Sequence, residues 1–164
     1  MTSKQNQQTT HLTIHTDGAC TGNPGPGGVG VVIQFWNEGT KGERLRLSYG
    51  QREVTTNNRM ELSAAIYALE VVSSRSDIDA NTPMTLHSDS QLVINGITKW
   101  IKNWKRNGWR KADTKPVMNA DLWNILDDLT AHFPKLSFSW VRGHNGDPDN
   151  EEADALATSA IPQV

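Results

Sequence analysis

Four carboxylates stand where acidic side chains could act on a ligand. Asp17 follows an alternating apolar stretch, and Asp89 follows a second, shorter one. We expect Asp17 to end the first strand and Asp89 to end the fourth, and the carboxyl ends of strands are where open α/β sheets bind ligands. Glu61 and Asp154 fall in two stretches of helical composition. The sequence therefore presents a candidate acidic cluster.

Each of the first three acids also has an ordinary structural interpretation to weigh. Asp89 could cap the helix that begins with SQLVINGI, and Asp17 could be a turn residue. Glu61 is harder to explain in this way, because it shares a helix face with residues such as Ala65 and Ala68 that should pack on the sheet. A buried carboxylate needs a partner, so Glu61 favours the functional interpretation.

For two further residues the pattern alone leaves the interpretation open. Asp154 lies in NEEADALA, whose neighbouring glutamates could form a solvated helix face. His144 lies in the loop VRGHNGDPDN, where it could accept a proton or assist product release, or could be a surface histidine. The other histidines have no i, i+4 pair on an expected helix and no neighbouring cysteine, which argues against a zinc site.

Converging carboxylates would require cations. Two carboxylates about 4 Å apart repel by roughly 4 kcal/mol at an effective dielectric constant near 20. Hard oxygen ligands select Mg²⁺, with Mn²⁺ as a substitute. Two such ions can activate a water, align it with the phosphorus and stabilise the departing oxygen of a phosphodiester. The acids thus predict a metal-dependent nuclease that holds two ions in its substrate complex.

The elements that must position these acids predict one domain with a mixed sheet. A chain of 164 residues with 36% hydrophobic content supports a single core. We expect a polar, disordered leader over residues 1–10 and one domain over 11–164. Strands are expected at 11–16, 28–35 and 44–49, forming an antiparallel meander, and at 84–88 and 136–142; helices are expected at 58–72, 89–97, 118–132 and about 149–160.

A basic segment interrupts this acidic chain, whose net charge is −2. Residues 99–111 hold six of the 16 lysines and arginines and no acid. Trp100 and Trp104 lie four apart and can share a helix face, which suits a sugar–phosphate track. The tryptophans, with Trp109, could instead form the core of a small lobe whose cations are merely solvated. Both interpretations can hold together.

Other patterns exclude several classes of protein. The single cysteine, Cys20, cannot form an intramolecular disulfide and fits a cytoplasmic protein, and no apolar run is long enough to span a membrane. The stretch GNPGPGGVG contains G-x-G-x-x-G, but the strand-like VVIQFW follows it, so we reject a dinucleotide site. We expect these glycines to form a turn with little bulk to obstruct a nucleic-acid backbone.

Several ordered motifs resemble bacterial ribonucleases H of type 1, from about His11 to Ala160. They are TDGACTGNPGPGG, TTNNRMEL, SDSQ, GITKWIKNWKRNGWRKADTKPVMNADLW and WVRGHNGDPDNEEADALA. The resemblance implies a ribonuclease H-like α/β fold with a five-stranded mixed sheet, flanking helices and a basic helical protrusion. It also implies endonucleolytic hydrolysis of the RNA strand of an RNA/DNA hybrid, leaving 5′-phosphate and 3′-hydroxyl ends.

The resemblance also implies roles for individual residues. The metal-binding carboxylates would be Asp17, Glu61, Asp89 and Asp154, and His144 would be the mobile catalytic histidine. The RNA strand would be read in the minor groove, through 2′-hydroxyls, by Asn23, Asn57, Asn58 and Gln91. The DNA strand would be bound by Thr56 and Asn119, which match a phosphate pocket, and by Trp100, Trp104, Lys105 and Arg106, which match a channel.

One departure from the family and two competing functions stay open. Val54 stands where many relatives have an arginine that completes the DNA-phosphate pocket, and Arg52 is the nearby cation that could replace it. A catalytically silent module that binds hybrid or double-stranded RNA is one alternative. An interaction protein with a structural cation site is another, although it leaves the basic segment without a role. A monomer is the default expectation.

Overall fold

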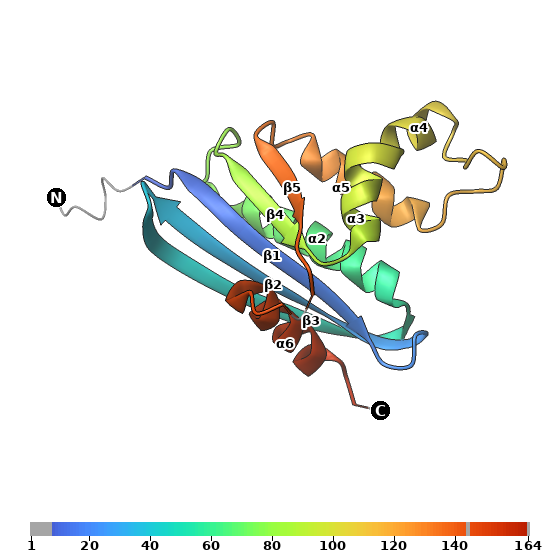
Figure 1. The fold of residues 1–164 in the computed structure, drawn as a ribbon, viewed down its shortest axis with the longest axis horizontal. Coiled ribbons are helices and arrows are strands. Elements are labelled where there is room, and N and C mark those ends of the chain that lie inside the picture. Colours follow the sequence, from blue (N-terminus) through green and yellow to red (C-terminus); the bar gives the residue numbers. More distant parts are fainter. Residues whose placement is uncertain (1–7, 144, 164) are drawn as a thin grey trace.

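A five-stranded mixed sheet forms the centre of the computed structural model, which describes residues 8–143 and 145–163 (Figure 1). The strand order is β3-β2-β1-β4-β5. The first three strands form an antiparallel meander, and β4 and β5 run parallel to β1. The predicted sheet is therefore confirmed. Its strands are β1 (His11–Cys20), β2 (Gly25–Asn37), β3 (Thr40–Thr55), β4 (Met84–Ser88) and β5 (Leu136–Trp140).

Helices cover both faces of the sheet. Helix α2 crosses behind it between β3 and β4, and α6 lies on the front face over β1 and β2 (Figure 1). The basic helical protrusion is also present, as the segment that contains α4. The helices are α2 (Asn57–Ser74), α3 (Gln91–Asn95), the π turn η1 (Gly96–Trp100), α4 (Ile101–Arg106), α5 (Ala120–Thr130) and α6 (Pro148–Ala160).

Helix α2 forms because its apolar residues recur at helical spacing and its first turn is capped. The hydroxyl of Thr56 accepts a hydrogen bond from the backbone N–H of Arg59. Buried residues of this helix, such as Leu62 and Leu69, belong to the same hydrophobic core as Ile14 of β1. Burying one such side chain contributes about 1.5–3 kcal/mol, so this face fixes α2 against the sheet.

Successive residues of β1 point to opposite faces of the sheet, and this alternation decides what each helix meets. A Cβ atom on Gly18 would lie 2.3 Å from the carbonyl carbon of Met60, so Gly18 faces α2. Asp17 is paired with Gly30, and Gly30 faces α6. Asp17 therefore lies on the α6 face.

The glycine-rich stretch, residues 22–30, forms the predicted turn only at its start, where Gly22 has a φ of 79°, and the prediction was wrong for the later glycines. The chain reverses within residues 21–24, and the glycines that follow belong to β2. Cβ atoms on Gly28 and Gly30 would lie 2.2 and 2.1 Å from the carbonyl oxygens of Ala157 and Ala153 in α6. These glycines therefore let a helix backbone approach the sheet. The sequence pattern hid this role because glycine is depleted in strands.

Replacing Gly30 with alanine should force α6 away from the sheet. We expect the free energy of unfolding to fall by about 1–3 kcal/mol, the usual cost of overpacking, as measured by urea denaturation. Gly42→Ala is the control, because a Cβ atom there would be 3.4 Å from its nearest neighbour. Equal stability of the two variants would contradict this account of the α6 contact.

The protrusion has a small core of its own that joins the main one. The Trp104 ring lies 6.0 Å from that of Trp100 and 5.2 Å from that of Trp123 in α5. Trp109 also packs against the main core, whereas Trp100 is 39% exposed. The packed lobe foreseen from the sequence is therefore present, and it leaves the Trp100 indole partly exposed.

The residue just before β1 already pairs with β2. The Thr10 backbone N–H donates to the carbonyl of Trp36 at 2.7 Å, directly before β1 begins. Residues 1–7 of the predicted leader lie outside the described residues. Within residues 8–143 and 145–163, we find no helix with the length and apolar content to cross a membrane.

Candidate metal centre

Parallel pairing of β1 with β4 brings Asp17 and Asp89 together. The last paired residues are Thr16 and Ser88, and the two acids come next in their chains. The prediction that Asp17 ends its strand was wrong, because β1 continues to Cys20 along β2. The residues after Asp17 are small and carry little strand preference of their own, and their conformation comes from this pairing. Only the pairing with β4 stops, which leaves an opening between the two strands.

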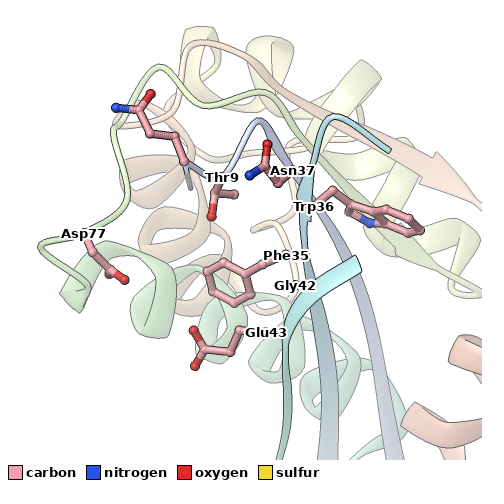
Figure 2. A pocket seen from close by; sticks show the side chains of 8 residues that line it. Thr9, Phe35, Trp36, Asn37, Gly42, Glu43 and Asp77 are labelled. Carbon is pink, nitrogen blue, oxygen red and sulfur yellow. The ribbon is translucent and has the colours of Figure 1, made fainter. Parts of the chain in front are cut away.

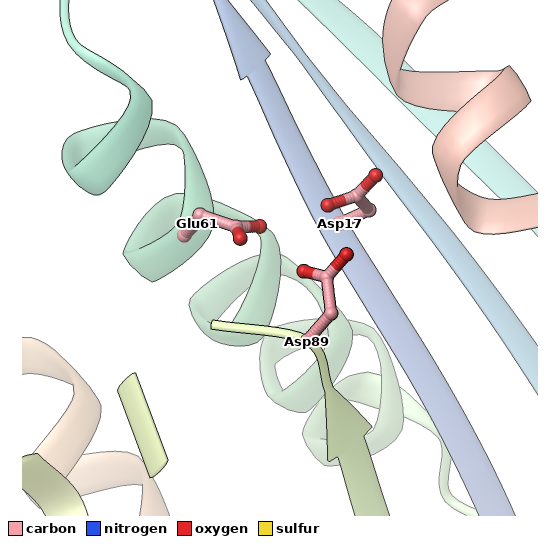
Figure 3. Close-up of side chains that lie close together, drawn as sticks. All are labelled: Asp17, Glu61 and Asp89. Carbon is pink, nitrogen blue, oxygen red and sulfur yellow. The ribbon is translucent and has the colours of Figure 1, made fainter. Parts of the chain in front are cut away.

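Glu61 reaches this opening from α2 (Figure 3). Its Oε1 accepts a hydrogen bond from the backbone N–H of Gly18 at 2.5 Å. One carboxylate oxygen from each of Asp17, Glu61 and Asp89 lies within 4.8 Å of the others. The predicted convergence thus holds for these three acids.

Asp89 is not the helix cap that one interpretation of the sequence offered. The Ser90 hydroxyl takes this position and accepts a hydrogen bond from the backbone N–H of Val93 at 3.2 Å. Behind Asp89 lies Gly143, where a Cβ atom would be 2.8 Å from Asp89 Oδ2. The Asp89 carboxylate is therefore available to the cluster and is backed by the connection between β5 and α6.

The other two predicted catalytic residues come from the last part of the chain. Asp154, on α6, acts on Asp17 through a side-chain hydrogen bond and through its charge. It is not among the three acids whose oxygens lie within 4.8 Å of one another. His144 lies outside the described residues.

Burial and mutual repulsion make the cluster costly when it is ionised. The Asp17 side chain belongs to a residue that is only 5% exposed, and burial, followed by the charge of Asp89, raises its pKa to about 8. Burial and then the charge of Asp17 raise the pKa of Glu61 well above its usual value. Hard oxygen donors in this arrangement fit a divalent cation, which would replace the protons.

The residues predicted to read the RNA strand lie close to the carboxylates along the chain and at helix starts. Asn57 and Asn58 open α2, the helix that carries Glu61, and Gln91 opens α3, just after Asp89. The backbone N–H of Asn57 donates to Oδ1 of Asn23 at 2.9 Å, which joins the turn before β2 to the start of α2.

The residues predicted to hold a DNA phosphate are linked through an arginine that sequence reasoning missed. Arg59 Nη1 donates to Oδ1 of Asn119 at 3.2 Å, and its guanidinium makes two hydrogen bonds to Asp121 at 3.0 and 2.8 Å. Because the Arg59 backbone N–H also donates to Thr56, one residue ties both parts of the pocket together. Only its position three residues after Thr56, in the first turn of α2, could have drawn attention to it.

The residues predicted to form the DNA channel differ in how readily they could bind a phosphate. Lys105 forms an ion pair with Asp127 of α5 at 2.8 Å, whereas Arg106 is exposed. Trp100 and Trp104 border a mainly apolar hollow of about 320 Å³. Its other lining residues are Asn58, Leu92, Lys111, Val117, Met118, Asn119 and Trp123.

A second hollow, of about 500 Å³, lies at the opposite end of β1 from the carboxylates (Figure 2). Its two acids, Glu43 and Asp77, are held by Arg75 at 2.8 and 2.7 Å, and the guanidinium also lies over the Phe35 ring. Their negative charge is therefore already balanced. This hollow does not offer the charge that a cation would need.

Comparisons with known proteins agree on one family. A family model described as RNase H matches residues 9–162. The ribonuclease H of Chelativorans sp. strain BNC1 is 50% identical over 150 residues, which cover 92% of this chain and 85% of the relative. Among solved structures, LC9-RNase H1, a type 1 RNase H with the type 2 active-site motif, gives a TM-score of 0.76 at 28% identity, covering 93% of this chain and 72% of that one. LC11-RNase H1 in complex with an RNA/DNA hybrid gives 0.67 at 26% identity, covering 92% and 96%.

Proposed function

This chain belongs to the ribonuclease H family, and from that premise we propose that its acidic cluster carries out the cleavage of the RNA strand in RNA/DNA hybrids. The chain is an endonuclease that hydrolyses the RNA strand of such hybrids. The observation that carries the assignment of the site is the approach of carboxylate oxygens from Asp17, Glu61 and Asp89 to within 4.8 Å of one another. We assign Asp154 to the same site because it acts on Asp17.

The four carboxylates would hold Mg²⁺, or Mn²⁺ in its place, with two ions in the substrate complex. When bound, these ions supply a nucleophilic water and stabilise the departing 3′-oxygen, so that the ends are 5′-phosphate and 3′-hydroxyl. The chain itself orients the ligands. The Gly18 N–H holds Glu61, and the close packing of Gly143 restrains Asp89. His144, on the same connection as Gly143, is proposed to move a proton during product release.

Discrimination between the strands would come from residues around the cluster. We propose that Asn23, Asn57, Asn58 and Gln91 bind 2′-hydroxyls of the RNA strand, and that Thr56 and Asn119 bind a phosphate of the DNA strand. Trp100, Trp104 and Arg106 would follow the DNA strand; Lys105 would have to exchange Asp127 for a phosphate. Val54 is 71% exposed and brings no charge, so the candidate cations are Arg52, two residues earlier in the chain, and Arg59, which contacts both Thr56 and Asn119.

Trp100 offers a test of the DNA-strand surface. We expect Trp100→Ala to raise KM for a hybrid about 5-fold or more with little change in kcat, because the variant loses an aromatic contact to the DNA-strand backbone that is made equally in the ground state and the transition state. Trp36→Ala, which removes a half-buried indole beside the hollow at the opposite end of β1, is the control for loss of a tryptophan. Equal KM values for the two variants would remove Trp100 from the binding surface.

The function itself is tested by comparing RNA/DNA, RNA/RNA and DNA/DNA duplexes of one sequence with Mg²⁺. Cleavage should be confined to the RNA strand of the hybrid and should stop with a chelator. Binding of the hybrid without cleavage would instead indicate a silent module. Nucleic-acid affinity that is absent or independent of salt would indicate an interaction protein with a structural cation site. A cytoplasmic location and a monomeric state remain predictions.

A further inference from the structure

A polar cluster beneath the first turn of α6 lies beside the metal centre and is not used by the proposed chemistry. His15 of β1 and His87 of β4 stack with ring centroids 4.4 Å apart and planes within 14°. His15 stands two residues before Asp17 in β1, so these two side chains share a strand face, and His87 stands two residues before Asp89, which follows the end of β4. His15 is only 6% exposed. The stacked histidine pair therefore forms a rigid surface next to the carboxylates.

Two carboxylates at the start of α6 face this histidine pair. Nε2 of His15 lies 3.6 Å from Oδ2 of Asp147, and its Nδ1 lies 3.9 Å from Oδ2 of Asp149. Asp147 is also the cap of α6, because its Oδ1 accepts from the backbone N–H groups of Asp149 and Asn150 at 3.0 and 3.2 Å. One side chain thus both begins the helix and faces β1.

Strand β3 restrains the same end of α6 from the other side. Arg44 donates to Asp149 at 2.7 Å and also to Glu152. Arg46 donates to Glu152 at 2.6 Å. The start of α6 is therefore held by ion pairs to β3 and faces His15 of β1, in addition to the glycine contacts further along the helix.

The consequence for the site follows from the geometry of a helix. Asp154 comes two turns after Asp147, roughly 10 Å along the axis, so a shift at the cap is carried rigidly to it. The connection that ends at Asp147 also contains Gly143, which packs against Asp89. The start of α6 therefore controls two of the four acids at once.

We propose that His15 and Asp147 are positioning residues that set the affinity of the carboxylate cluster for divalent metal. This inference rests on the proposed function. His15 holds Asp147, the N-cap residue of α6, in place over β1. Asp147 in turn fixes the position of Asp154 and of Gly143, which packs against Asp89. The role is specific to the metal site, because the His15–Asp147 contact is made two residues from Asp17 on the same strand face.

Two substitutions separate this role from general stability. His15→Phe keeps a ring to stack on His87 but removes both nitrogens that face Asp147 and Asp149. Asp147→Asn keeps a residue type that caps helices well but removes the charge that faces His15. Arg75→Gln is the control, because it removes two ion pairs at the far end of β1 and can lower stability without touching α6.

Metal binding is measured directly on the full chain without substrate, as Mn²⁺ binding followed by electron paramagnetic resonance. We expect both variants to bind Mn²⁺ about 10-fold more weakly, the usual effect of losing an outer partner of metal ligands. The Mg²⁺ concentration for half-maximal cleavage should rise by a similar factor with KM for the hybrid unchanged. Mn²⁺ affinity in Asp147→Asn that matches Arg75→Gln would overturn the proposal. Failure of the parent protein to cleave hybrids would instead refute the proposed function, because Mn²⁺ binding is compared independently of cleavage.

Discussion

Asp17→Asn is expected to abolish Mg²⁺-dependent cleavage of an RNA/DNA hybrid while binding of the hybrid survives. Beyond the effect of burial, the charges of Asp89 and Asp154 both raise the pKa of Asp17, which places it at the centre of the cluster. The asparagine side chain removes one of the anions that would hold the cations. We expect kcat to fall by about 10³-fold or more, because the water and the leaving oxygen would lose their shared stabilisation. Single-turnover cleavage and equilibrium binding of a labelled hybrid measure the two effects separately.

Asp79→Asn is the matched control for this substitution. Asp79 is an exposed acid in the turn before β4, and its contact is with the backbone N–H of Asn81. Cleavage by this variant should equal that of the parent protein. Retained cleavage in Asp17→Asn would eliminate the proposed role of the cluster, whereas loss of hybrid binding would mean that the substitution disturbed more than the metal ligands.

The second large effect concerns stability in the absence of divalent cations. The pKa of Asp17 is raised to about 8 from an ordinary value of 3.8, and that of Glu61 is also raised. The folded chain therefore binds protons that the unfolded chain releases, and the stability this contributes is full below about pH 4 and is lost as pH rises to about 8. We expect the cluster to cost on the order of a few kcal/mol at pH 8 in EDTA.

Mg²⁺ should reverse this loss, because its binding replaces protons. At 100 times its dissociation constant, a ligand of the folded state adds about 2.7 kcal/mol, and we expect the rise in Tm to be larger at pH 8 than at pH 5. Burial lowers the pKa of His15 and of His87, which adds stability as pH rises toward 6.5, in the opposite sense. The difference between the parent and Asp17→Asn isolates the cluster. Parallel pH profiles of Tm in EDTA would contradict the raised pKa values.

The sheet and the convergence of three acids could be predicted because both depend on local pattern. Alternating and apolar stretches identified all five strands, and the helix with Glu61 was evident from its spacing. The exact meeting point could not be predicted, since it depends on the register of two strands far apart in the chain. The pairing of Thr16 with Ser88 is a property of the folded sheet. No local preference in the residues after Asp17 predicts that β1 continues to Cys20.

The parts that sequence reasoning missed are contacts between distant segments. The histidines at 15 and 87 have no spacing that marks them as a pair, and they meet because β1 and β4 run side by side. The glycines of β2 looked like a turn because their partner, the backbone of α6, lies more than a hundred residues later in the chain. Arg59 gave little signal for a similar reason, since its partners Asn119 and Asp121 lie at the start of α5, far along the chain.

The parallel register of β1 and β4 also limits how the length of this chain can vary during evolution. An extra residue within β4 would move Asp89 along the strand by about 3.3 Å and turn it to the other face, which would separate it from Asp17. The exposed hairpin at Glu38 and Gly39 and the turns between α2 and β4 lie outside the registered stretch. Insertions and deletions among homologues should therefore accumulate in those two places and be purged between Met84 and Asp89.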